Sequence, residues 1–498
     1  MITPNAPTIG VVELPDFRLI DPKGENWFSD TRNQDRNNLP MISKQVLLSS
    51  LQAEGFDAQL INLVKGDYQG EYGKVIWKGT EFTKVYFGHK IDDIDPSAYD
   101  AWGITNNFSQ LREIAGITIK HLSSKGKPVV VGGSDAIAEP QFYLTAGAAA
   151  VVLDKSGAAN GPIMNHVLGK KPKEELSGVI LANGNQPSPR PRRHLSPQDW
   201  PLPNLSVAKQ CLGIGHANFN FPEERLPIGS IFTDIGCDRH CDFCQTPEYH
   251  IGYRAMLPER VSQWLQIQKQ AGAKSVLSHS DQFLGRILRK GGRDEILEIM
   301  NTIRELELAV CWTNGLELKK MTLGRGINRK NTDLTPDEEL ISAVLGWNGK
   351  AGCYSVFIPA ERPLVGQQNY AKLMPWQEHC RIVKAIVQAG TPSIVYGVII
   401  GFADDSDESL SHLEEALWKL YEEVLAMNPS AEFQVLPMAI APIPGTQQGI
   451  HMRQSGLLRF DDPSIFGGIF TPSVDTHYLS YEEIANWQTR LARIGNQY

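Results

Sequence analysis

The chain has 498 residues, which is enough for two large α/β domains or three smaller ones. Its residues are 42% hydrophobic and 21% charged, which is the composition of a globular protein and excludes wholesale disorder. The formal net charge of −8 argues against a general nucleic-acid binder, because such a protein needs a basic field.

Residues 1–168 are expected to form a first domain in which short apolar strands alternate with helices. The predicted strands are Thr8–Leu14, Asp57–Val64, Tyr99–Thr105, Pro128–Val131 and Ala148–Leu153, and the predicted helices are Ser43–Glu54 and Gln110–Ser123. This alternation predicts an N-terminal doubly wound parallel sheet, which is a Rossmann-like α/β fold. Ligands of such sheets bind at the carboxyl ends of the strands.

Residues 169–226 are expected to be a proline-rich linker. The stretch Asn183–Pro203 contains six prolines and three arginines. We expect it to run extended over the surface without a regular element, and its arginines to be solvated.

A second α/β series is predicted over residues 227–445. Its strands are expected at Ile228–Asp234, Ser275–His279, Ala309–Thr313, Tyr354–Ile358, Ser393–Gly401 and Glu432–Met438. Between the last two, Asp407–Met427 has leucines at helical spacing and is followed by Pro429. Six such repeats predict a partial (β/α)6 barrel whose active face lies at the strand carboxyl ends. Residues 446–498 are expected to be a C-terminal extension with one helix, Tyr481–Ile494.

The strongest chemical signal is a CxxxCxxC motif formed by Cys237, Cys241 and Cys244 directly after the first strand of this series. Three thiolates at this spacing can hold one corner of a [4Fe–4S] cluster. Because an ordinary cluster takes four cysteines, three leave one iron open to chelate a small molecule.

Two other interpretations of these cysteines remain open at this stage. One is a zinc site with His240, His250 or His279 as a fourth ligand. The other is three unrelated buried cysteines, although burial gives no reason for this spacing. The remaining four cysteines are isolated, and Cys311 and Cys353 lie in strands and are expected in the core. The chain has seven cysteines, an odd number, and three of them are clustered. This pattern indicates a reducing compartment rather than a disulfide scaffold.

From these cysteines onward, the chain resembles the radical S-adenosylmethionine (SAM) superfamily over roughly Ile228–Gly445. The superfamily has an aromatic residue before the last cysteine, which is Phe243 here. Four further segments resemble its later motifs in the same order: Ser280–Phe283, Trp312–Leu316, Gly397–Phe402 and Pro442–Thr446.

This resemblance implies three roles for the matched residues. Asp281 would meet the amino group of SAM, Asn314 would belong to the third-strand element, and Gly397 and Gly401 would lie near the adenine. It also implies that SAM binds the open iron and that one electron, from a donor such as a flavodoxin or ferredoxin, splits it into methionine and a 5′-deoxyadenosyl radical. The cofactors then carry the difficult step.

An α/β domain upstream of such a barrel resembles the cobalamin-binding subgroup. Gly132 and Gly133 follow a strand, and Thr105 precedes Gly132 by 27 positions, as in that subgroup. A plain Rossmann turn is the alternative. Pro15–Asn38, after the first strand, contains no histidine to lie under cobalt. The chain is therefore similar to the tryptophan 2-C-methyltransferase type that lacks the DxHxxG motif, although a degenerate domain that binds nothing would also lack it.

Three further candidates come from the loops. Arg254 follows the cysteine loop and is a candidate to neutralise a cofactor carboxylate, and Glu361 is a candidate to hold a polar end of SAM or substrate, with a surface ion pair as the alternative. Lys319–Asp333 carries five basic residues, including Arg325 and Arg329. It is expected to be a lid over an anionic group, or else a solvated loop.

The leading hypothesis is a cytoplasmic, cobalamin-dependent radical SAM methyltransferase that methylates a carbon of a small molecule or biosynthetic intermediate, an indole being one candidate. No apolar run reaches the length of a membrane span, no secretory signal is evident, and no nucleic-acid partner is expected. Two alternatives stay open. One is a radical SAM enzyme with a vestigial first domain that catalyses a rearrangement, an oxidation or C–C bond formation. The other is a zinc-stabilised binding protein.

Overall fold

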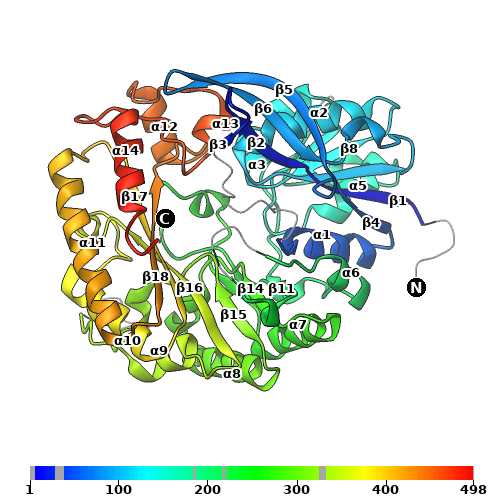
Figure 1. Cartoon of the computed structure of the whole chain (residues 1–498). Coiled ribbons are helices and arrows are strands. Elements are labelled where there is room, and N and C mark those ends of the chain that lie inside the picture. Colours follow the sequence, from blue (N-terminus) through cyan, green and yellow to red (C-terminus); the bar gives the residue numbers. More distant parts are fainter. Residues whose placement is uncertain are drawn as a thin grey trace.

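The computed structural model describes residues 6–27, 39–182, 187–215, 219, 221–324 and 332–496. Two parallel sheets with helices on them dominate this part of the chain, and a smaller antiparallel sheet lies beside the first (Figure 1). The predicted α/β class with parallel sheets is therefore confirmed.

The first sheet has six strands in the order β10-β9-β8-β7-β1-β4. They are β1 (Thr8–Glu13), β4 (Asp57–Asn62), β7 (Ala101–Thr105), β8 (Val129–Gly132), β9 (Ala150–Val152) and β10 (Val179–Leu181). All pairs are parallel except β9 with β10. Helices α1 (Ile42–Ala53), α2 (Arg112–Ser123) and α5 (Asn160–Val167) join the strands. The strand order runs outward from β1 in both directions, so a cleft opens where it reverses.

The second sheet is parallel throughout, and its strands follow one another in chain order. They are β11 (Ile228–Ile231), β14 (Ser275–Ser278), β15 (Ala309–Trp312), β16 (Gly352–Glu361), β17 (Ser393–Ile400) and β18 (Glu432–Ala439). The connecting helices are α7 (Pro258–Ala271), α8 (Gly292–Glu305), α9 (Glu338–Leu345), α10 (Trp376–Gln388) and α11 (Asp407–Met427). All six strands predicted for this series are present.

Helix α11 shows why these segments fold as they do. Ser406 and Ser409 form a capping box at its start, which satisfies backbone N–H groups that lack a helical partner. Its leucines at positions 410, 413, 417 and 420 are buried on one face. The helix ends at Met427, two residues before Pro429, as predicted.

The third sheet, in the order β3-β2-β6-β5, was not predicted. Its strands are β2 (Asp16–Ile20), β3 (Asn26–Trp27), β5 (Tyr68–Trp77) and β6 (Thr80–Gly88). The segment Pro15–Asn38, for which no regular element was expected, forms β2 and β3 in its described part. Residues 28–38 lie outside the described residues. The β5–β6 turn is Lys78–Gly79, both with positive φ, a pair that signals a hairpin less strongly than Asn-Gly.

The segment expected to be a linker is more ordered than its composition indicated. Strand β10 adds to the first sheet, and α6 (Leu205–Gln210) follows it. The prediction that Asn183–Pro203 lacks a regular element fails at its end, where Pro197–Asp199 form a 3-10 turn. Trp200 is buried, and its indole N–H donates to the Ser156 carbonyl at 2.9 Å. The three arginines are exposed, as expected.

The C-terminal extension returns to the first part of the chain through α12 (Gln447–Gln454), α13 (Pro463–Phe466) and α14 (Tyr481–Leu491). Figure 1 shows α13 beside the third sheet. There Lys84 of β6 pairs with Asp462 at 3.0 Å and with Glu113 of α2 at 2.6 Å. The Trp77 indole donates to the Pro472 carbonyl at 3.0 Å. Among the described helices, none is long and apolar enough to cross a membrane.

Candidate functional site

A cavity of about 770 Å³ lies between the carboxyl ends of the two parallel sheets. From the first sheet it is lined by residues that end or follow β7, β8 and β9, including Thr105, Gly132, Gly133 and Lys155. From the second sheet it is lined by residues that follow β14, β15 and β18, including His279, Asp281 and Asn314. The site is therefore built jointly, at the edges where parallel sheets bind ligands.

The cysteine loop begins at a narrow neck. Strands β12 (Asp234–Ile235) and β13 (Arg254–Ala255) pair antiparallel, so residues 236–253 form one closed loop that carries all three cysteines. At the neck Gly236 has φ +78°, and a Cβ there would lie 1.9 Å from the Gly252 carbonyl oxygen. Only glycine allows the two sides of the loop to approach so closely.

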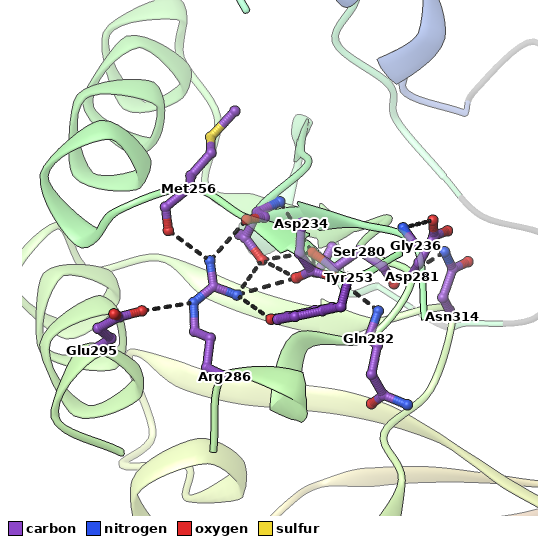
Figure 2. A network of polar contacts seen from close by, with 12 residues as sticks. Asp234, Gly236, Tyr253, Met256, Ser280, Asp281, Gln282, Arg286, Glu295 and Asn314 are labelled. Carbon is purple, nitrogen blue, oxygen red and sulfur yellow. Dashed lines mark hydrogen bonds and ion pairs between the residues drawn. The ribbon is translucent and has the colours of Figure 1, made fainter. Parts of the chain in front are cut away.

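Arg286 ties this neck together (Figure 2). Its side chain is fully buried, and its guanidinium contacts the Asp234 carboxylate at 3.2 Å. The same group donates to the carbonyl oxygens of Thr233 (2.8 Å) and Met256 (3.0 Å) and to the Tyr253 hydroxyl (3.3 Å). One cation thus connects the strand that enters the loop to the strand that leaves it.

The segment after β14 is bonded to the same neck. The Gln282 backbone N–H donates to Asp234 at 2.7 Å, and the Gly236 N–H donates to Asp281 at 2.7 Å. Asp281 therefore stands at the start of the cysteine loop while it borders the cavity. Burial raises the pKa of Asp281 to about 6, and the Gly236 N–H and Lys155 oppose this rise. Asn314 donates to the His279 carbonyl at 2.8 Å, which joins the next loop to this one.

Ion pairs connect the cysteine loop to the segments that follow β15 and β16. Asp238 pairs with Lys320 at 2.5 Å, Arg239 pairs with Glu317, and Lys320 also contacts Glu317 at 3.0 Å. Glu361 pairs with Lys372 at 2.5 Å, and the Lys372 ammonium lies 5.5 Å from the centre of the Phe243 ring. These contacts fix both halves of the motif against the loops that follow β15 and β16.

The half-buried thiols fit a metal-bound form. Burial raises the pKa of Cys237, against the opposing effects of the Arg239 N–H and Lys320. Burial raises the pKa of Cys241 to about 11, against the opposing effect of Lys372. A metal replaces the thiol proton, and the neighbouring cations then compensate the thiolate charge. The donor set and its surroundings therefore suit an anionic iron–sulfur cluster.

The zinc alternative finds little support. His240 and His250 are exposed, and His279 follows β14. Among the described residues, no three His, Cys, Asp or Glu side chains converge on a point where one metal ion would be held. A cluster needs thiolates set more widely apart, since each one binds a different iron.

The other predicted residues of the second sheet are Phe243, within the cysteine motif, and two glycines of the β17 segment. Phe243 packs edge-on to Tyr370, with ring centres 5.2 Å apart, and against Phe402 at 6.5 Å. Gly401 ends β17 with φ +93°, and its N–H donates to Asp405 at 2.8 Å. Gly397 lies within β17, where a Cβ would be 2.3 Å from the Phe357 ring.

Arg254 and Glu361 are engaged in contacts within the protein. Arg254 donates to the carbonyl oxygens of His194 (3.1 Å) and Ile251 (3.2 Å), which ties the end of the cysteine loop to the connecting segment. Glu361 is buried, with φ +57°.

The glycine pair of the first sheet lies at the carboxyl end of β8. Thr105 of β7 lies opposite Gly132 of β8 in the parallel register. Gly133 has φ +103°, and a Cβ there would lie 2.2 Å from the Asn106 carbonyl oxygen. The glycine therefore lets the loops after β7 and β8 touch at the edge of the cavity.

Sequence reasoning missed the contacts that join the two halves. Gln245, just after the last cysteine of the motif, donates to the carbonyl oxygens of Pro444 (2.9 Å) and Ser134 (3.5 Å). Lys155, after β9, donates to the Ser134 hydroxyl at 3.0 Å. These residues are far apart in the sequence and follow no local pattern, so no signal marked them.

The expected basic lid is corrected in part. Lys319 donates to the backbone carbonyl of Ala371 at 2.9 Å, and Lys320 is buried in the ion pairs described above. Both are structural ties, not free ligands for a substrate anion. Arg325, Arg329 and Lys330 lie outside the described residues.

Comparison with solved structures shows the same fold in cobalamin-dependent radical SAM enzymes. TsrM from Kitasatospora setae, a radical SAM methyltransferase with cobalamin and a [4Fe–4S] cluster bound, matches with a TM-score of 0.60 and 13% identity over 98% of this chain and 91% of that chain. OxsB, a cobalamin-dependent SAM radical enzyme with aqua-cobalamin and SAM bound, matches with a TM-score of 0.65 and 13% identity over 97% of this chain and 66% of that chain. At this identity the likeness establishes a shared fold.

A second TsrM structure, with tryptophan substrate and a SAM analogue bound, gives a TM-score of 0.58 over 98% of this chain and 89% of that chain, again at 13% identity. No protein-family model matches the sequence, and no curated protein matches it. At the level of the fold, the structural likeness agrees with the resemblance that the motifs indicated.

The buried Arg286 contacts predict a large effect on stability. Arg286→Met leaves Asp234 without its cation, so we expect the free energy of unfolding to fall by about 3–5 kcal/mol. Arg289→Met is the matched control, because Arg289 also pairs with Glu295 but its side chain is 37% exposed. Arg289→Met should lower the free energy of unfolding by less than about 1 kcal/mol. Denaturant unfolding of both variants measures this, and equal losses would show that the buried contacts are not special.

Proposed function

We propose that the chain is a cobalamin-dependent radical SAM methyltransferase that transfers a methyl group to a carbon of a small molecule. The observation that carries the proposal is the shared cavity: the glycine turn after β8 and the Asp281 loop beside the cysteines open onto it from opposite sides. A fold shared with TsrM and OxsB over nearly the whole chain supports it.

The proposed organisation has four parts. Residues 1–168 form a Rossmann-like, cobalamin-binding-type domain, 169–226 connect, 227–445 form a partial (β/α)6 barrel, and 446–498 form the extension. The in-order parallel sheet supports the barrel, because helices joining adjacent parallel strands on one side bend a sheet toward closure. The connecting part contributes β10 and α6 to the packing of the first domain.

The three cysteines of the motif are proposed to hold a [4Fe–4S] cluster with one open iron, which supplies an electron to bound SAM. Lys320 and Lys372 compensate the charge of the thiolates, and Arg239 anchors the loop through Glu317. An electron donor such as a flavodoxin or ferredoxin is a further proposal that the chemistry requires.

SAM is proposed to lie along the cavity wall formed by the second sheet. There the Asp281 carboxylate accepts a hydrogen bond from the amino group of SAM, and Asn314 holds the adjoining loop in place. Phe243, Gly397 and Gly401 are not among the described residues that line this cavity, and their place near the adenine stays a proposal from the resemblance. Because the carboxylate is surrounded by protein, its attraction for the amino group of SAM is weakly screened by water.

Cobalamin is proposed to bind against the first sheet. Thr105, Gly132 and Gly133 allow close approach of the corrin or its tail. No histidine occurs in Pro15–Asn38, and His279 is the one histidine among the described residues that line the cavity. Because it comes from the second sheet, we propose that it would not be a ligand of cobalt.

The cluster is tested by substitution of the motif. Changing Cys237, Cys241 and Cys244 together to Ala should abolish iron and sulfide binding, the visible absorption of the cluster and all turnover, because the thiolates are the ligands. Cys380→Ala is the control and should bind iron as the wild type does. Full iron content in the triple variant would overturn the assignment, and zinc in place of iron in the wild type would favour the binding-protein alternative.

Cobalamin is tested by anaerobic titration with hydroxocobalamin. We expect a stoichiometric complex whose electron paramagnetic resonance spectrum, after reduction to Co(II), shows no nitrogen coupling from a protein histidine. A coupling that disappears in His279→Gln would contradict this and identify the ligand. A wild-type protein that takes up iron and sulfide but no cobalamin would favour the vestigial domain.

The pKa of Asp281 predicts how SAM binding depends on pH. Because burial raises this pKa to about 6, the carboxyl group is mostly neutral at about pH 5 and ionised at about pH 7. SAM affinity of the reconstituted protein should therefore rise roughly tenfold across this range. Asp281→Asn should bind weakly at every pH with no such rise. The same pH dependence in both proteins would exclude Asp281 as its origin.

A further inference from the structure

Lys155 is a cation in the cavity that the proposed cofactor contacts leave unused. It follows β9 and borders the cavity from the side of the first sheet. Its ammonium donates to the neutral Ser134 hydroxyl at 3.0 Å and lies 5.5 Å from the centre of the Tyr249 ring. Among the described residues, it forms no ion pair with a carboxylate.

The other charged groups that the first sheet contributes to the cavity wall have partners within the protein. Lys44, the only other lysine among the described lining residues, pairs with Glu13 at 3.0 Å. Asp135 pairs with Arg112 at 2.7 Å, and Asp154 accepts bonds from the backbone N–H groups of residues 156 and 159. Among the described lining residues, Lys155 is the one lysine that forms no ion pair with a carboxylate.

Such a cation is costly in the absence of a ligand. Lys155 is surrounded by protein, and this burial lowers its pKa, while Asp281 across the cavity opposes the fall. A hydroxyl and an aromatic face compensate an ammonium only in part. An anion that enters the cavity would gain both a strong hydrogen bond and the neutralisation of this charge.

The position of Lys155 limits which anion it can reach. Ser134, its hydrogen-bond partner, directly follows the Gly132–Gly133 turn where cobalamin is proposed to bind. Asp281, on the other side, is proposed to hold the amino group of SAM. Two oxyanions therefore come within its neighbourhood: the phosphate of the cobalamin tail and the carboxylate of SAM.

We propose that Lys155 is the anion-binding residue of the cavity and that it pairs with an oxyanion of one of these two cofactors. This inference rests on the proposed function and extends it, because it assigns to the first domain a charged contact that no motif marks. With a SAM carboxylate as the partner, Lys155 and Asp281 would hold the two ends of one amino-acid group. With the phosphate, Lys155 would hold the cobalamin tail against the glycine turn.

The test compares four probes on the cluster-reconstituted protein by anaerobic equilibrium dialysis. Cobalamin is paired with cobinamide, which lacks the phosphate and the nucleotide, and SAM is paired with decarboxylated SAM. The variants are Lys155→Met, which removes the charge at similar size, and Lys155→Arg, which keeps it. Lys120→Met, on the exposed face of α2, is the control.

We expect Lys155→Met to weaken one natural cofactor at least tenfold, a loss of about 1.4 kcal/mol, and to leave its analogue without the oxyanion unchanged. Lys155→Arg should retain most of the affinity, and Lys120→Met all of it. A loss for cobalamin but not cobinamide assigns the phosphate, and a loss for SAM but not decarboxylated SAM assigns the carboxylate.

Two results would overturn the inference about Lys155 while the proposed function stands. One is unchanged binding of both cofactors by Lys155→Met. The other is equal weakening of a cofactor and its analogue, which would show a change of cavity shape. If the wild-type protein binds neither cofactor, the proposed function fails and this inference falls with it.

Discussion

The buried pair of Arg286 and Asp234 is the interaction on which the geometry of the site depends. A guanidinium with no solvent contact must use its donors inside the protein, and here they reach both strands of the neck below the cysteines. Asp234 uses its second oxygen to hold the segment after β14. The position of the cysteine loop and the position of Asp281 are therefore set by one contact network, so that the two elements move together or not at all.

Charge is distributed differently on the two sides of that loop. Around the cysteines, Lys320, Arg239 and Lys372 each have a carboxylate partner. The charges of these three cations are therefore compensated whether or not the thiols are ionised. In the cavity, Lys155 lacks such a partner among the described residues, and burial raises the pKa of Asp281 to about 6. A cavity that keeps unpaired charges is arranged for ligands that bring the opposite charges with them.

The third sheet and the C-terminal extension enclose the first domain. Lys84 bonds to both α2 and the segment before α13, and Trp77 reaches the backbone at Pro472. The extension also meets the cysteine loop, where the Gln448 N–H donates to the Asp242 carbonyl at 3.0 Å. Residues 446–498 thus contact both halves of the cavity, which the strands of the second sheet alone do not complete.

The sequence by itself determined the elements whose signals are local. Apolar runs and helical leucine spacing marked helix α11 and the strands of both parallel sheets except β10, which lies in the segment expected to be a linker. The spacing of Cys237, Cys241 and Cys244 marked a candidate metal-binding loop after a strand. The glycine pair could be recognised in the sequence because Gly133 has a positive φ and lies against another loop, and both conditions disfavour other residues. Each signal lies within a few dozen residues and reflects one physical requirement at one place.

Only the tertiary structure decided which polar side chains meet. Arg286 lies in an unremarkable helical turn, Lys155 in a short loop and Trp200 in a proline-rich stretch, and each owes its role to partners distant in the chain. The antiparallel third sheet escaped prediction for the same reason: its strands are separated by a helix and a parallel strand, and its turn is a weak signal. The whole fold brings distant residues into contact. Such a contact therefore leaves no periodic pattern in a single sequence.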